Sequence, residues 1–182
     1  MQQHGPWKIK KRVVKYKNPW LEVHEDEVVQ PDGKPGIVGS VVIKPGISVL
    51  ALDDEGFVYL TKEFYYAVGR EGFGTVSGGI DKGESPLSAA KRELSEEIGV
   101  KAHKWIDLGM VDPFTATVNS PAYIFLAKGL TFMKTRHEGT EKIEIVKVRF
   151  EEAVKMVMQS KITHAQSCVL ILKAKEYLHS SK

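Results

Sequence analysis

The sequence has 182 residues, of which 42% are hydrophobic and 27% are charged. This size and composition predict one main globular domain and exclude extensive disorder. The net charge of +3 arises from 26 basic and 23 acidic residues, a balance that argues against a protein that coats nucleic acid. The single cysteine, Cys168, lies in an apolar run, so the pattern indicates a buried thiol and no internal disulfide.

Neither a signal-like start nor a membrane span is visible in the sequence. No run approaches the roughly 20 apolar residues that cross a bilayer. No early segment combines a basic start with a long apolar stretch. A cytoplasmic location is therefore the expectation.

The first third of the chain predicts β structure. Residues 7–16 and 20–29 mix β-branched and aromatic residues with charges, as exposed or edge strands do. The turn-forming residues 30–36 precede a strand pattern at 37–43, which indicates a hairpin. We expect an N-terminal antiparallel β region over residues 1–44, and it is the part expected to form a dimer.

The main domain is expected over residues 45–182 and begins with more strand patterns. Residues 47–52 and 57–60 flank a tight turn. After Gly83 the pattern changes to a helix: Ser85 can cap it, Pro86 suits its first turn and Gly99 can end it, with an apolar face made by Leu87, Ala90, Leu94 and Ile98.

Later segments complete a mixed α/β pattern. Residues 122–127 and 143–150 read as strands, and residues 151–159 and 163–178 read as helices with apolar faces. A sheet followed by a helix, more strands and further helices predicts an α/β sandwich with a mixed sheet.

Three glutamates on the first predicted helix carry the chemical signal. Glu93, Glu96 and Glu97 stand at i, i+3 and i+4, so their carboxylates share one face of the helix. A solvated acidic face is the ordinary interpretation of such a set. Here, however, Glu84 stands at the start of the helix, and Arg92 can orient carboxylates through paired hydrogen bonds. This context favours a site for a divalent cation that prefers oxygen ligands, such as magnesium or manganese.

At these residues the sequence resembles the Nudix hydrolase family, whose signature is G-x5-E-x7-R-E-U-x-E-E-x-G-U, where U is aliphatic. Residues 78–100 match every fixed position, through Gly78, Glu84, Arg92, Glu93, Leu94, Glu96, Glu97, Gly99 and Val100. The resemblance implies an α/β/α sandwich with a mixed sheet. It also implies Mg²⁺-dependent hydrolysis of a nucleoside diphosphate linked to another group, with Mn²⁺ as a substitute metal.

The resemblance also implies roles for individual residues. Glu93 and Glu97 are expected to be the principal metal ligands, and Glu96 a further ligand or the group that activates water. Glu84 would support the metal site and Arg92 would orient the glutamates.

The loop before the helix and a later segment supply the remaining expected groups. Gly78 and Gly79 let backbone approach the substrate phosphates, and the Ser77 carbonyl is expected to be another metal ligand. Between two later strands the related enzymes carry an additional catalytic glutamate, for which we select Glu141 over an ordinary charged loop residue.

The order of segments resembles the ADP-ribose pyrophosphatase branch over most of the chain, including residues 66–70 before the motif and 108–113 after it. Arg70 is expected to pair with a substrate phosphate, although such an arginine is also typical of a plain surface. Trp20 and Phe114 are expected to stack on a base, with core packing as the alternative. Members of this branch commonly exchange N-terminal strands, which implies a homodimer.

Two departures broaden the expected substrate class. Residues 74–78 read Gly-Thr-Val-Ser-Gly where relatives often carry a glutamate and a proline, and residues 62–66 lack an arginine common in that strand. Both changes fall outside the glutamate helix. We therefore expect hydrolysis of ADP-ribose and of other nucleoside diphosphate sugars.

Two alternatives stay open at this stage. One is a Nudix enzyme that acts on nucleoside triphosphates or RNA 5′ ends, but alternation along a strand would divide the N-terminal basic residues between two faces: Lys8, Lys10, Lys11, Arg12, Lys15 and Lys17. The other is a non-catalytic nucleotide-sensing module. Such a module would be expected to have lost motif carboxylates, and all of them are present here.

Overall fold

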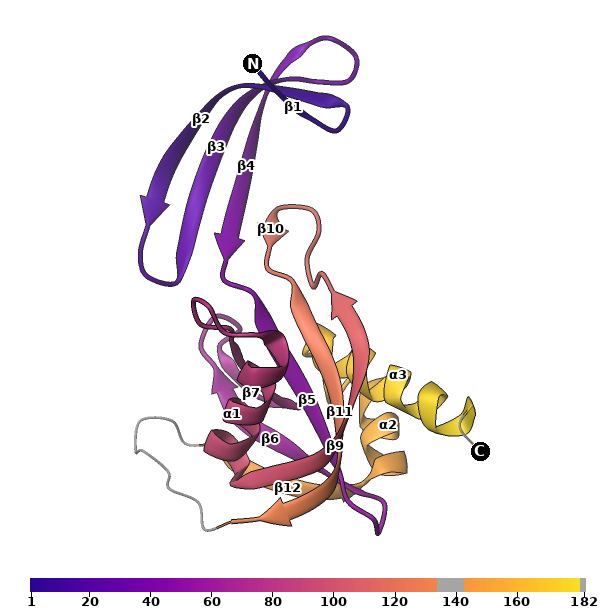
Figure 1. Cartoon of the computed structure of the whole chain (residues 1–182). Helices are drawn as coiled ribbons and strands as arrows, with labels where there is room; N and C mark the ends of the chain where they lie inside the picture. The colour runs from indigo at the N-terminus through magenta and orange to yellow at the C-terminus, as the bar shows by residue number, and fades with distance from the viewer. Residues whose placement is uncertain (134–142, 181–182) are drawn as a thin grey trace. The chain divides into compact units, whose positions relative to one another are not determined.

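The computed structural model describes residues 1–133 and 143–180 (Figure 1). These residues divide into two compact units. The first unit comprises Met1–Lys44 and Asp112–Pro121, and the second comprises Pro45–Val111 and the described chain from Ala122 onward. Residues 112–121, which the sequence placed with the main domain, thus group with the N-terminal strands.

The first unit is built on a five-stranded sheet in the order β1-β2-β3-β4-β10. The first four strands are antiparallel neighbours, which confirms the predicted N-terminal β region. β10 explains why residues 112–121 join this unit, because it runs parallel to β4 with Val118 opposite Val41. The strands are β1 (Gln2–His4), β2 (Trp7–Lys17), β3 (Leu21–Val29), β4 (Pro35–Ile43) and β10 (Val118–Asn119).

Three of the six basic residues of β2 form ion pairs across the sheet. Arg12, Lys15 and Lys17 form ion pairs with acidic residues of the neighbouring strand β3, namely Asp26, Glu25 and Glu22. Cross-strand pairs of opposite charge stabilise a sheet. These side chains therefore belong to the structure of the first unit.

The second unit contains a seven-stranded mixed sheet. Its main path is β12-β6-β5-β11-β9, with β7 paired to β6 and β8 paired to β5. β11 runs parallel to β5 and antiparallel to β9. The strands are β5 (Gly46–Leu52), β6 (Phe57–Tyr65), β7 (Arg70–Gly74), β8 (Val76–Gly79), β9 (Val100–Val111), β11 (Ala122–Phe132) and β12 (Glu144–Arg149).

Helices cover both faces of this sheet, and Figure 1 shows α1 on one side with α2 and α3 on the other. The helices are α1 (Pro86–Ile98), α2 (Phe150–Met158) and α3 (Ala165–Ser180). Alternate residues of β5 serve the two cores: Val49 packs with α1, whereas Leu50 packs with α2 and α3. The predicted α/β/α sandwich is confirmed.

The ends of α1 follow the predicted signals. Ser85 is extended, and its hydroxyl accepts a hydrogen bond from the Ser88 N–H at 3.2 Å. Gly99 ends the helix with φ of 64°, a left-handed conformation that costs glycine little. None of the helices in the described part of the chain has the length and apolar content that crossing a bilayer requires.

Several strands were not predicted from the sequence. β7 and β8 are short and glycine-rich, so they lack the β-branched alternation that marks a strand. β9 carries lysines, a histidine, an aspartate and a glycine, yet it pairs with β11 along most of its length. In all three cases tertiary pairing, and not local propensity, decides the conformation.

Replacing Leu94 tests whether α1 is held mainly by its apolar face. Leu94 is fully buried in the core beneath α1. We expect Leu94→Ala to lower the free energy of unfolding by about 2–5 kcal/mol, because it removes a buried side chain and leaves a cavity. The measurement is urea unfolding. Leu172→Ala is the control, since Leu172 is 38% exposed, and it should cost about 1 kcal/mol or less; equal losses would contradict this account of the core.

Candidate active site

The motif residues meet where α1 packs against β8. β8 pairs with β5, with Ser77 opposite Ser48 and Gly78 opposite Ile47. The capped first turn of α1 and the paired strand β8 are both regular elements. Side chains from the helix and backbone from the strand are therefore held in a defined relation to each other.

The guanidinium group of Arg92 is the hub of this cluster. Arg92 donates to both carboxylate oxygens of Glu84 at 3.1 Å, through Nε and Nη2. Its Nη1 donates to Glu93 at 2.7 Å and to Glu96 at 3.1 Å. Its Nη2 also donates to the Gly79 carbonyl at 3.0 Å. The planar guanidinium group thus forms hydrogen bonds with two carboxylates of α1, with the carboxylate of Glu84 in the preceding loop and with the backbone of β8.

The pKa values of Glu84 and Glu93 are shifted in opposite directions. The hydrogen bond from Arg92 holds the pKa of Glu84 below its ordinary value. Burial raises the pKa of Glu93, although its hydrogen bond to Arg92 acts in the opposite direction. The hydrogen bond to Glu84 raises the pKa of Arg92 still further, so Arg92 stays a cation. Additional positive charge would stabilise the charged form of the desolvated Glu93 carboxylate.

Gly78 gives Glu93 its place beside the strand. A Cβ atom at position 78 would overlap the Cδ and Oε1 atoms of Glu93. The side chain of Glu93 is only 14% exposed, whereas that of Glu96 is 59% exposed. Glycine is therefore required here for close approach between the backbone of β8 and a carboxylate of α1.

The chemistry of the donors fits a divalent cation that prefers oxygen ligands. The group offers the carboxylates of Glu93, Glu96 and Glu97 and the backbone of β8, which includes Ser77. Within residues 1–133 and 143–180, no set of three or more histidine, cysteine, aspartate or glutamate side chains is gathered as a ready metal site. Glu93 and Glu96 each accept a hydrogen bond from Arg92 through one carboxylate oxygen.

The remaining predicted residues that the structure describes lie elsewhere in the two units. Arg70 lies at the start of β7 in the second unit and donates to Thr163 Oγ1 at 3.3 Å. Trp20 and Phe114 belong to the first unit and are 67% and 58% exposed, so neither fills a core there. Glu141 lies outside the described residues.

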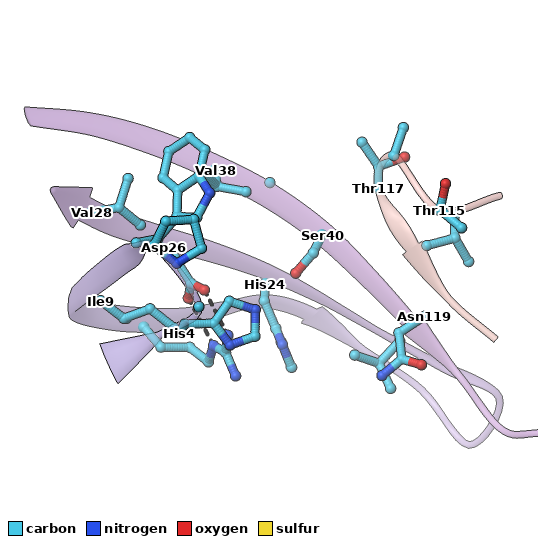
Figure 2. Close-up of a pocket in the computed structure, with 18 residues that line it drawn as sticks. His4, Ile9, His24, Asp26, Val28, Val38, Ser40, Thr115, Thr117 and Asn119 are labelled. Carbon is cyan, nitrogen blue, oxygen red and sulfur yellow. Dashed lines mark hydrogen bonds and ion pairs between the residues drawn. The ribbon is translucent and has the colours of Figure 1, made fainter. Parts of the chain in front are cut away.

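The first unit has a cavity of its own, of about 610 Å³ (Figure 2). Asp26 lies in its wall and is only 5% exposed, paired with Arg12 through two hydrogen bonds of 2.7 and 2.6 Å. Figure 2 shows Thr115 and Asn119 on the other side of the cavity from Asp26. Neither Trp20 nor Phe114 lines it.

The sequence did not reveal a chain of buried hydroxyl groups behind β8. Ser48, Thr75 and Ser167 are fully buried, and the Thr75 hydroxyl is hydrogen-bonded to both serine hydroxyls. His164 is in turn hydrogen-bonded to Ser167. A serine within the apolar stretch of α3 is a weak hint of such a contact. Its partner Thr75 lies 92 residues away in the chain, a pairing that no local pattern can indicate.

Comparison with known proteins agrees with this geometry. The family model of the NUDIX domain matches residues 42–166, and that of the nucleoside diphosphate sugar hydrolase N-terminal domain matches residues 7–37. The chain is 31% identical to an ADP-ribose pyrophosphatase of Bacillus subtilis (strain 168), over 89% of this chain and 90% of that protein. It is also 22% identical to a methanol dehydrogenase activator of Bacillus methanolicus, over 83% of each.

Solved structures give the same fold. The crystal structure of an ADP compounds hydrolase superposes with a TM-score of 0.83, at 18% identity, over 100% of this chain and 98% of the other. The chain therefore belongs to the Nudix hydrolase family, in the branch that includes the ADP-ribose pyrophosphatases. Members of this family are pyrophosphatases that generally use divalent metal ions.

Replacing Gly78 tests the close approach between β8 and Glu93. We expect Gly78→Ala to lower pyrophosphatase turnover on the order of 10- to 100-fold, because the new methyl group displaces the Glu93 carboxylate from its place. Turnover and melting temperature are measured together. Gly39→Ala is the control, since a Cβ atom there meets open space, and it should keep wild-type turnover. Full activity of Gly78→Ala would show that Glu93 does not need this position.

Proposed function

We propose that this chain hydrolyses the pyrophosphate bond of ADP-ribose and of other nucleoside diphosphate sugars with Mg²⁺, giving a nucleoside monophosphate and a sugar phosphate. The observation that carries this proposal is the Arg92 cluster, in which every charged residue of the Nudix motif is present and Arg92 joins Glu84, Glu93 and Glu96. The match of residues 7–37 to the N-terminal domain of nucleoside diphosphate sugar hydrolases supports the substrate class.

In this proposal Glu93 and Glu97 hold the metal, with Glu96 and the Ser77 carbonyl as further ligands. When bound, Mg²⁺ would neutralise charge on the pyrophosphate and lower the pKa of an attacking water. Mn²⁺ is the proposed substitute, because it accepts the same oxygen ligands.

The other motif residues act on the protein side of the reaction. Arg92 fixes the direction of the carboxylates, and Glu84 fixes Arg92 by a two-point contact. Gly78 and Gly79 leave room for substrate phosphates beside the backbone. Glu96 or Glu141 is proposed to take a proton from the attacking water.

We propose further substrate contacts outside the Arg92 cluster by analogy with the ADP-ribose pyrophosphatase branch. Arg70 would pair with a phosphate, and Trp20 and Phe114 would stack on the base. Trp20 and Phe114 are exposed, which leaves their rings free to stack. We also propose that the chain forms a homodimer through residues 1–44 and that it is cytoplasmic.

The first experiment is a substrate panel with Mg²⁺. It comprises ADP-ribose, several nucleoside diphosphate sugars, dinucleotides, nucleoside triphosphates and capped RNA, with release of nucleoside monophosphate as the readout. We expect turnover of ADP-ribose together with the sugar nucleotides. Action confined to triphosphates or RNA would reject this substrate class, and no turnover of any member would favour a non-catalytic nucleotide-sensing module.

The metal ligands are tested by removing one charge at a time. We expect Glu93→Gln and Glu97→Gln each to lower kcat on the order of 10- to 100-fold or more and to raise the Mg²⁺ concentration for half-maximal activity, because an amide is a weaker ligand than a carboxylate. Glu176→Gln on α3 is the matched control, since Glu176 is an exposed helical glutamate. Unchanged magnesium activation in both motif variants would refute the assignment.

A further inference from the structure

A continuous chain of hydrogen bonds runs through the second unit beneath β8. The Ser48 and Thr75 hydroxyls lie 2.5 Å apart, and the Thr75 and Ser167 hydroxyls lie 3.0 Å apart. The Ser167 hydroxyl also accepts from the Thr75 backbone N–H at 3.0 Å and lies 2.8 Å from His164 Nδ1. These hydrogen bonds thus join β5, the residue just before β8 and the N-terminal end of α3.

Thr75 occupies the point where the strand changes its partner. Before it, Gly74 is opposite Thr61 of β6, and after it, Val76 is opposite Val49 of β5. Thr75 itself belongs to neither strand pair. The Ser167 hydroxyl therefore accepts a hydrogen bond from the Thr75 N–H, which stands outside the strand pairing at this change of partner.

The hydrogen bonds of this network can all be satisfied if each hydroxyl donates to the next group along it. A serine hydroxyl provides one donor and two acceptor sites. Ser167 accepts from the Thr75 N–H. In one consistent assignment it would also accept from the Thr75 hydroxyl and donate to His164 Nδ1, while Ser48 would donate to Thr75. Burial lowers the pKa of His164, which agrees with a neutral ring that accepts at Nδ1. A fully satisfied buried network rigidifies the segments that it joins.

The far end of the chain is closed by an aromatic ring. Tyr65 of β6 lies 5.7 Å from the His164 ring, measured between centroids. It has room because β7 carries glycines: a Cβ atom at Gly72 would lie 2.5 Å from the Tyr65 ring, and one at Gly74 would lie 2.7 Å from its hydroxyl. Burial, and then the charges of Glu63 and Glu97, raise the pKa of Tyr65 to about 12. Tyr65 therefore packs against the His164 end of the hydrogen-bond chain.

We propose that Thr75 and Ser167 are positioning residues, which hold β8 so that Ser77, Gly78 and Gly79 lie at the correct distance from the glutamates of α1. This inference rests on the proposed function of the same site. The first of these residues follows Thr75 by two positions, Gly78 lies against Glu93, and the Gly79 carbonyl accepts from Arg92. A shift of β8 along or away from β5 would move all three. Misplacement on the order of 1 Å is enough to reduce catalysis strongly.

The protein supplies a matched control for the chemistry of Thr75. Thr61 is also a buried threonine of the second unit, 1% exposed, and its hydroxyl has no hydrogen-bond partner among the described residues. Valine has the shape of threonine without the hydroxyl. Thr61→Val therefore removes a buried hydroxyl with no hydrogen bond to lose, whereas Thr75→Val breaks the network at its centre.

The experiment compares Thr75→Val, Thr75→Ser and Thr61→Val in the full chain. We expect Thr75→Val to lower kcat and weaken Mn²⁺ binding by about tenfold each, as loss of a group that supports metal ligands does, with little change in KM. Thr75→Ser keeps the hydroxyl and should restore both values, and Thr61→Val should match wild type. Mn²⁺ binding is followed by electron paramagnetic resonance of the free ion, at a temperature where unfolding measurements show each variant to be folded.

Mn²⁺ binding is measured without substrate, so the positioning role is tested even if the substrate panel rejects ADP-ribose. Ser167→Ala is the second variant, because it removes the acceptor from α3 without changing β8, and it should weaken Mn²⁺ binding in the same direction. If Thr75→Val and Ser167→Ala lower only the melting temperature and keep wild-type kcat and Mn²⁺ affinity, the network is purely structural and the proposal is overturned.

Discussion

The pairing of Arg92 with the carboxylates around α1 is the interaction on which the rest of the site depends. Glu93 and Glu96 lie three residues apart on the same helix face, and Glu84 lies just before the helix, so their charges repel one another. Arg92 offsets this repulsion with hydrogen bonds to all three and to the Gly79 carbonyl. The same contacts join the helix to β8, so the charge balance and the geometry of the site have one cause.

The two-sided core makes this arrangement rigid. The face of α1 that carries Leu94 is fully buried against the sheet, and the opposite face of the sheet is covered by α2 and α3. Because β8 pairs with β5 in the middle of that sheet, the strand beside the glutamates is part of the core. Catalytic groups on such elements have little conformational freedom left to lose when a ligand binds. This is the condition for preorganised catalysis.

The two units differ in the family models that they match. The second unit contains the complete charged motif and matches the NUDIX domain, which accounts for pyrophosphatase chemistry. The first unit matches the N-terminal domain of nucleoside diphosphate sugar hydrolases and presents exposed aromatic residues.

The sequence alone determined the elements whose signals are local. The cap at Ser85, the stop at Gly99 and the spacing of the glutamates are contained within a few helical turns. Ala90, Leu94 and Ile98 lie on the buried face of α1 as predicted, but Leu87 is 36% exposed, so its place on that face was predicted wrongly. The hairpin around residues 30–36 was also predictable, because its turn residues stand directly between two strand patterns. The family followed from the motif, in which every fixed position is filled.

Tertiary structure alone decided what depends on distant partners. The glycine-rich strands β7 and β8 and the polar strand β9 are strands because neighbouring strands pair with them. Residues 112–121 join the first unit because β10 pairs with β4. The buried contact between Thr75 and Ser167 spans 92 residues. Hydrogen bonds across such separations depend on how the whole chain packs, and no periodicity in the sequence records them.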